Sequence, residues 1–381
     1  MFGLVFGVWV TRIPAVKQRL HLSDGTLGVA LFATSAGLIV VTLVAGRLVD
    51  RFGSARVTRL ASVATSLLLV APAVAGDLGS FMAALFALGV AGGALDVGMN
   101  AHGVRVERAY GRPLMTTLHA YYSLGSLAGA VFGGAFAGAG IGPLPTFLAA
   151  GLPCAAVAAI AARWLPVDSG AVGGTGPARR PGPAQAAREA AGAGAPSRSR
   201  SGMVILLLGL IGLCALVGEG AAGDWSAVYL RDSLGTSAGF AAAGFAAFSI
   251  TMTAGRLLGD RLVARFGPVR LVRGCGLLAA AGLAGGLISR DPLGAAAGFA
   301  VLGAGLSCIV PQVFSAGGKA DPVRPGRGLA RVVGLSYLGL VAGPVVIGAC
   351  ASVVGLPLAL GIPVLLALGV AAFAWALGIP R

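Results

Sequence analysis

Long apolar runs, separated by short polar stretches rich in arginine and glycine, dominate this chain. A helix rises about 1.5 Å per residue, so it crosses the roughly 30 Å hydrocarbon core of a bilayer in about 20 residues. Eleven apolar runs have that length and predict membrane-spanning helices. They lie near residues 27–45, 57–75, 81–103, 114–138, 143–163, 203–224, 237–256, 269–288, 293–314, 330–350 and 356–377.

A twelfth span is expected at the beginning of the chain. The opening stretch Met1–Val10 is apolar but has only half the length that a span requires. Two explanations stay open: the true start lies upstream of Met1, or the first span is a short one. With it, the chain predicts an all-α integral membrane protein of twelve spans.

The composition excludes a soluble protein. Hydrophobic residues make up 57% of the 381 residues and charged residues only 11%, against about a quarter in soluble domains. The mean hydropathy of +0.90 exceeds what a soluble core can absorb, so the chain uses lipid as its solvent. The cysteines lie inside apolar segments without a CxxC pair, which argues against a disulfide framework and a zinc site. They are Cys154, Cys214, Cys275, Cys308 and Cys350.

The loop charges predict the orientation in the membrane. If the loop after the first span is external, 23 of the 28 Lys and Arg residues fall on the cytoplasmic side. Without the long central loop the count is still 17 against 5, and cytoplasmic loops carry such an excess. A net charge of +15 can indicate nucleic-acid binding, but these arginines occupy short loops rather than one face of a domain.

The stretch 164–202 separates two halves of the chain. It consists mainly of Gly, Ala, Pro, Ser and Arg and has almost no large apolar residues, so it predicts a flexible cytoplasmic linker. The predicted organisation is an N-terminal six-helix bundle at 1–163, this linker, and a C-terminal six-helix bundle at 203–381.

The two halves resemble copies of each other. The segment Gly46–Gly53 (GRLVDRFG) recurs as Gly255–Gly267 (GRLLGDRLVARFG), and Leu124–Gly129 recurs as Leu338–Gly343. The offsets are 209 and 214 residues, nearly the same. A duplicated six-span unit predicts a pseudo-twofold fold with a substrate site near the midplane, between the halves.

The segment Gly46–Arg56 (GRLVDRFGSAR) and its degenerate copy at 255–270 resemble the loop signature of the major facilitator superfamily. Three further segments resemble a bacterial branch related to fucose permeases: Trp9–Pro14, Leu95–Asn100 and Asp224–Asp232. The resemblance implies a transporter of the bacterial cytoplasmic membrane.

The signature also predicts a cytoplasmic latch, a charged cluster that holds the inner side shut. Glycine at 46 permits close helix approach, and Asp50 at a helix end can pair with arginine or with a helix N-terminus. The alternative is that these charges only set the topology. The latch candidates are Gly46, Arg47, Asp50, Arg51, Gly53, Arg56 and, as a weaker copy, Asp260.

Acidic residues inside spans are candidates for function, because a charge at mid-bilayer costs on the order of 3 kcal/mol. Asp96 and Glu219 lie well inside spans, and Asn100 shares a helix face with Asp96. A carboxylate there can bind and release a proton, although a hydrogen bond between spans four and five is the structural alternative. Pro311 breaks a helix and can open the backbone to a cavity. The candidates for proton coupling or substrate binding are Asp96, Asn100, His119, Tyr122, Glu219, Gln312 and Tyr337.

The outer ends of spans one and seven carry a possible gate. Arg12 and Asp224 lie there with opposite charges and predict an outer salt bridge. Trp9 and Trp225 occupy related positions, where interfacial anchoring explains a tryptophan.

These features together predict a secondary transporter that works by alternating access and takes up a small polar metabolite, such as a sugar, with protons. A proton-coupled exporter of drugs or metabolites and a non-transporting sensor or scaffold are the alternatives. The sequence has no GxxxxGK[ST] motif, no metal-ligand spacing and no nucleophile–base pair, so we expect neither an enzyme nor a cofactor. The expected partners are the substrate, protons and the lipid bilayer, with no nucleic acid and with the chain as a monomer.

Overall fold

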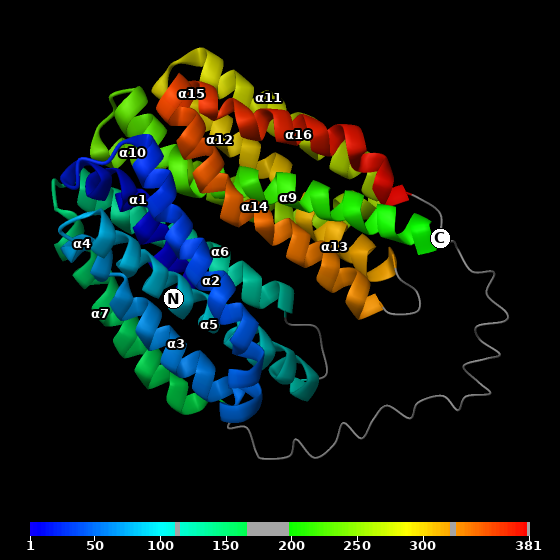
Figure 1. Ribbon diagram of the computed structural model, residues 1–381, viewed down its shortest axis with the longest axis horizontal. Helices are drawn as coiled ribbons and strands as arrows, with labels where there is room; N and C mark the ends of the chain where they lie inside the picture. The colour runs from blue at the N-terminus through cyan, green and yellow to red at the C-terminus, as the bar shows by residue number, and fades with distance from the viewer. Residues whose placement is uncertain (111–114, 166–197, 321–324, 379–381) are drawn as a thin grey trace.

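The computed structural model describes residues 1–110, 115–165, 198–320 and 325–378 (Figure 1). Every regular element within these ranges is helical. Ten of the described helices are long and apolar enough to cross a membrane. The predicted all-helical membrane fold is therefore observed, and the linker prediction for 164–202 falls mostly outside the described residues.

The first of the helices before the central loop, α1, is longer than the apolar stretch at the beginning of the chain. It has 18 residues and continues through Arg12 and Lys17, whereas the apolar run ends at Val10. Both charged side chains are buried, and bonds described below compensate them. The elements are α1 (Phe2–Arg19), α2 (Asp24–Phe52), α3 (Ser54–Leu68), α4 (Ala71–Val74), α5 (Leu78–Tyr110), α6 (Met115–Gly138), α7 (Pro143–Ala161) and the 3-10 turn η1 (Ala162–Trp164).

The helices after the central loop include one predicted span that is broken. Residues 293–314 form two helices that separate at Ser307. Pro311, four residues later, has no backbone N–H and so cannot donate the helical hydrogen bond to the Ser307 carbonyl. The elements are α9 (Arg198–Val228), the π-helical turn η2 (Tyr229–Ser233), α10 (Ala238–Phe266), α11 (Pro268–Ser289), α12 (Pro292–Leu306), α13 (Ile309–Ala320), α14 (Pro325–Val354), α15 (Leu356–Ala359), α16 (Gly361–Phe373) and η3 (Ala374–Gly378).

Helices α2 and α10 repeat each other in detail. Each has 29 residues and follows a serine N-cap, Ser23 or Ser237, whose hydroxyl accepts a backbone N–H three residues on. Each ends at a glycine with positive φ, Gly53 (85°) or Gly267 (73°). The two helices begin 214 residues apart in the sequence. At this offset Asp260 corresponds to Gly46 rather than to Asp50. The sequence match at offset 209 is therefore out of register.

In Figure 1 the blue-to-teal helices α1 to α7 lie together, and the green-to-red helices α9 to α16 form a second group. The two groups meet where α2 packs on α14 and α6 packs on α10. Glycines permit this approach: a Cβ on Gly28 would lie 2.9 Å from the Cα of Gly348, and one on Gly239 would lie 2.9 Å from the Cα of Gly138. These contacts are at the outer ends of the four helices.

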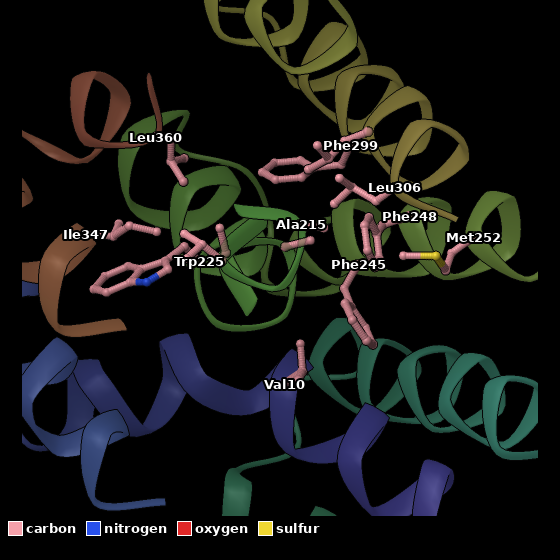
Figure 2. Packing of buried hydrophobic residues seen from close by; sticks show 14 of the residues in the cluster. Val10, Ala215, Trp225, Phe245, Phe248, Met252, Phe299, Leu306, Ile347 and Leu360 are labelled. Carbon is pink, nitrogen blue, oxygen red and sulfur yellow. The ribbon is translucent and has the colours of Figure 1, made fainter. Parts of the chain in front are cut away.

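Apolar side chains fill the second group (Figure 2). Trp225 is fully buried beside Ile347 and Leu360, and Trp9 is 4% exposed against Phe81 and Phe147. Both tryptophans are therefore core residues, and the expectation that they anchor the membrane interface is wrong.

Candidate functional site

Asp96 and Asn100 lie one turn apart on α5 and are bonded to each other. The Asn100 amide donates to the Asp96 carboxylate over 3.1 Å and to the Asp96 backbone carbonyl over 2.9 Å. Both side chains are half-buried. The amide orients the carboxylate, as their shared helix face predicted.

Glu219 of α9 forms an ion pair with Arg256 of α10. One Nη of Arg256 lies 3.2 Å from one carboxylate oxygen and 3.3 Å from the other. The side chains are 31% and 35% exposed. Arg256 was not among the candidates, because charge pattern placed it at the beginning of a cytoplasmic loop. Instead α10 continues for ten residues beyond it.

Two tyrosines lie within electrostatic range of both acids, one tyrosine in each group of helices. The charges of both Asp96 and Glu219 act on Tyr122 of α6 and on Tyr337 of α14. Arg256 also acts on Tyr122, whose ring lies 5.3 Å from that of Phe2. Five helices therefore contribute polar side chains around the two tyrosines, and we call Asp96, Asn100, Tyr122, Glu219, Arg256 and Tyr337 the central cluster.

The two remaining cavity candidates are placed less directly. Gln312 is half-buried on α13, just beyond the break that follows α12. His119 belongs to α6, but its side chain lies outside the described residues. Its role therefore remains a prediction.

Lys17 ties the outer ends of the two groups together. Its ammonium lies 2.6 Å from a carboxylate oxygen of Asp24, at the beginning of α2, and 2.6 Å from one of Asp232, in η2. Gln18 also donates to Asp232, over 3.2 Å. The side chains of the three charged residues are 11%, 22% and 25% exposed, so water screens them only in part. We call Lys17, Asp24 and Asp232 the outer lock.

The predicted outer pair of Arg12 and Asp224 is not formed. Arg12 is 3% exposed and donates to the Ile141 carbonyl, which fixes α1 to the loop between α6 and α7. Asp224 lies inside α9, where the described residues give it no hydrogen bond and no ion pair. Lys17, five residues beyond Arg12 in α1, makes the contact between the groups instead.

The charged candidates for the cytoplasmic latch are exposed. Asp50 and Asp260 have no ion pair within the described part of the chain, and a Cβ on Gly46 would meet nothing within 4 Å. The guanidinium of Arg51 lies 5.4 Å from the ring centre of Phe52. The outer ends of the helices are thus held together, whereas the latch residues Arg47, Arg51 and Arg56 face solvent.

Buried polar groups lie beside the latch. Ser54, at the beginning of α3, shares a hydrogen bond of 3.2 Å with Nδ1 of His102 and accepts one of 3.2 Å from Arg105. Ser54 is fully buried and His102 is 7% exposed. These bonds fix the end of α5 against the α2–α3 corner.

Comparison with known proteins agrees with this architecture. The family model described as Major Facilitator Superfamily matches residues 1–322. Membrane protein MosC of Rhizobium meliloti is 32% identical over 365 residues, which cover 94% of this chain and 83% of that protein. The uncharacterised transporter y4wD of Sinorhizobium fredii is 31% identical over 355 residues, covering 91% of this chain and 87% of y4wD. An uncharacterised MFS-type transporter of Yersinia pestis is 30% identical over 372 residues, which cover 98% of this chain and 92% of that transporter.

Solved transporters share the fold. A single-residue mutant of the nucleoside transporter NupG superposes with a TM-score of 0.73 at 12% sequence identity, covering 98% of this chain and 96% of the NupG chain. A D-xylose–proton symporter superposes with a TM-score of 0.73 at 15% sequence identity, and the match covers 98% of this chain and 95% of the symporter. An inward-facing bacterial homologue of the human lysosomal transporter Spinster superposes with a TM-score of 0.72 at 16% sequence identity. The match covers 99% of this chain and 94% of the homologue.

The relatives and the fold are those of transporters rather than enzymes, as the sequence predicted. The protein is a multi-pass transporter of the bacterial cytoplasmic membrane. The match over residues 1–322 and the relatives that align along most of the chain identify it as a member of the major facilitator superfamily.

Proposed function

We propose that this protein takes up a small polar metabolite, such as a sugar, together with protons. Two six-helix halves, related by a pseudo-twofold axis and making twelve spans, rock about a site between them. The central cluster binds the substrate and the proton. The outer lock and the cytoplasmic latch close the two sides in turn.

The observation that carries this proposal is the central cluster itself. Asp96 and Glu219 belong to different halves of the chain, yet both act on the same two tyrosines. Charged groups inside a membrane are costly, so they occur where they serve a substrate or ion pathway. Carboxylates, an amide and tyrosine hydroxyls supply the hydrogen bonds that a polar solute needs.

The closed outer lock and the exposed latch support an inward-facing state. Lys17 connects α1 and α2 with η2 at the outer side, while Asp50 and Asp260 at the other side are without partners in the described chain. A carrier must form the two sets of contacts alternately, since simultaneous opening would let solutes and protons leak.

The sugar preference rests on likeness. The fucose-permease-like segments include Leu95–Asn100, which contains the bonded Asp96 and Asn100. The D-xylose–proton symporter shares the fold, although at 15% identity it supports the architecture rather than the substrate. The nucleoside transporter NupG makes nucleosides the next class to test.

The first experiment follows internal pH in liposomes that contain the purified protein. We expect one compound from a panel of pentoses, hexoses and nucleosides to drive proton entry, and Asp96→Asn to reduce that entry roughly 5- to 150-fold, the usual range of coupling between two sites. Asp291→Asn is the matched control: this acid is exposed at the N-cap of α12, where Asn caps equally well.

The rival functions give different results in the same assay. Proton movement against the compound's movement identifies an exporter. Equal coupled flux in wild type and Asp96→Asn removes Asp96 from proton coupling. A compound that binds without any flux identifies a sensor.

Lys17→Ala is expected to open the outer side. The change leaves the carboxylates of Asp24 and Asp232 facing each other without their shared cation. The lost ion pairs are worth about 1–2 kcal/mol after discounting for partial exposure, which shifts the population of outward-open molecules by roughly tenfold. Distances between spin labels on the outer ends of α1 and α10 report this shift.

The control for that measurement is Lys319→Ala. Lys319 is the other lysine of the chain, exposed on α13 and without an ion pair within the described residues. An unchanged distance distribution in Lys17→Ala would show that the outer lock does not hold the outer side.

A further inference from the structure

A groove outside the central cluster runs between α10, α11 and α12. Its volume is about 560 Å³, and its wall is almost entirely apolar. Leu258, Leu262 and Phe266 of α10 line one side, and Leu271 and Leu278 of α11 line the other. Leu258, Phe266 and Leu278 are about half exposed, so the groove opens to the surface that faces lipid.

The hydroxyl groups in this groove are already bonded inside the protein. The Thr251 hydroxyl donates to the Ala300 carbonyl over 2.6 Å, and the Ser307 hydroxyl donates to Ala304 over 2.7 Å. Cys275 and Cys308 are free thiols that lie close to each other, and the Cys308 thiol donates to the Gly255 carbonyl over 3.6 Å. Away from Arg270, the wall therefore offers few partners to a polar solute, whereas an acyl chain needs none.

Arginine marks one end of the groove. Arg270 belongs to its lining and is exposed, and the guanidinium of Arg265 lies 5.5 Å from the ring centre of Phe266. Both lie at the α10–α11 corner, which the positive-inside rule assigns to the cytoplasmic surface. No acidic residue lines the groove. Arg256 and Asp260, both near Cys308, carry opposite charges.

The dimensions of the groove suit one lipid chain. Its lining along α10 extends from Thr251 to Phe266, about 22 Å at 1.5 Å per residue. One leaflet contributes about 15 Å of hydrocarbon. A chain whose headgroup lies at Arg270 can therefore extend through its leaflet within the groove.

We propose that this groove is a binding site for an anionic phospholipid of the cytoplasmic leaflet. One acyl chain lies along the apolar wall, and the headgroup phosphate, whose negative charge no ammonium group of the same lipid neutralises, lies at Arg270 and Arg265. The proposal concerns lipid binding only, so it stands or falls independently of the transported substrate and of proton coupling.

Gly274→Leu tests the chain part of the site. Gly274 lines the groove, and a Cβ there would meet nothing within 4 Å. A leucine side chain at this position can therefore occupy the groove without a shift of the neighbouring helices. Gly285→Leu is the matched control: it is on the same face of α11, equally open, three turns away and outside the groove. Both changes remove a helical glycine, so they affect the helix itself alike.

The probes are phosphatidylglycerol and phosphatidylethanolamine, added to delipidated protein and counted by native mass spectrometry. We expect wild type and Gly285→Leu to retain one phosphatidylglycerol per chain, and Gly274→Leu to bind it about tenfold more weakly because the buried methylene groups are lost. Arg270→Gln is expected to weaken it about fivefold, and Arg59→Gln, an exposed arginine on α3, to leave it unchanged.

Two results overturn the proposal. Equal retention in all variants means that the groove does not hold the lipid. Equal affinity for the two lipids means that the arginines do not select an anionic headgroup.

Discussion

Glu219→Ala is expected to be among the most damaging single changes in this protein. It leaves the guanidinium of Arg256 within a membrane-spanning helix without its partner at 3.2 Å. An unpaired charge there costs up to about 3 kcal/mol, and the side chain's 35% exposure reduces that figure. We expect a lower melting temperature in detergent and a loss of transport on the order of a hundredfold.

Arg256→Ala should be damaging for the mirror-image reason, since it leaves the Glu219 carboxylate unpaired. The double variant Glu219→Ala/Arg256→Ala removes both charges and should recover much of the stability but not the transport. This double-mutant cycle separates the two roles of the pair. If the two single losses of stability simply add in the double variant, the residues are not coupled.

The sequence predicted the spans well because hydrocarbon thickness limits their length. The predicted span 269–288 is observed as Pro268–Ser289, and 143–163 as Pro143–Ala161. For helices that project beyond the bilayer, the predicted spans were too short, because an arginine ends an apolar run but does not end a helix. The predicted span 237–256 is observed as Ala238–Phe266, which is why Arg256 was assigned to a loop.

The central cluster and the outer lock differ in how much a sequence can reveal. Asp96 and Asn100 pair within one helix, so their spacing of four was sufficient. Lys17 and Asp232 are 215 residues apart, and local spacing gives no sign that they meet. The π-helical turn η2, which carries Asp232, likewise leaves no hydrophobic pattern that distinguishes it from the end of α9.

Gly7→Ala is expected to separate helices α1 and α6. A Cβ on Gly7 would overlap the Ser126 carbonyl oxygen and lie 2.8 Å from the Ala130 nitrogen, and backbone atoms cannot turn away as a side chain can. Gly3, one turn earlier, lies equally close to the backbone of Tyr122. Overpacking of this kind costs about 1–3 kcal/mol, so the melting temperature should fall by several degrees.

The consequence for function follows from the position of Tyr122 in the central cluster. If α1 moves away from α6, the tyrosine moves relative to Glu219 and Asp96, whose charges it senses. Gly7→Ala should therefore reduce transport as well as stability. Gly369→Ala is the control, because a Cβ on this glycine of α16 meets nothing within 4 Å and alanine favours the helix by about 1 kcal/mol. Unchanged transport in a destabilised Gly7→Ala protein would mean that the α1–α6 contact holds the fold without positioning the site.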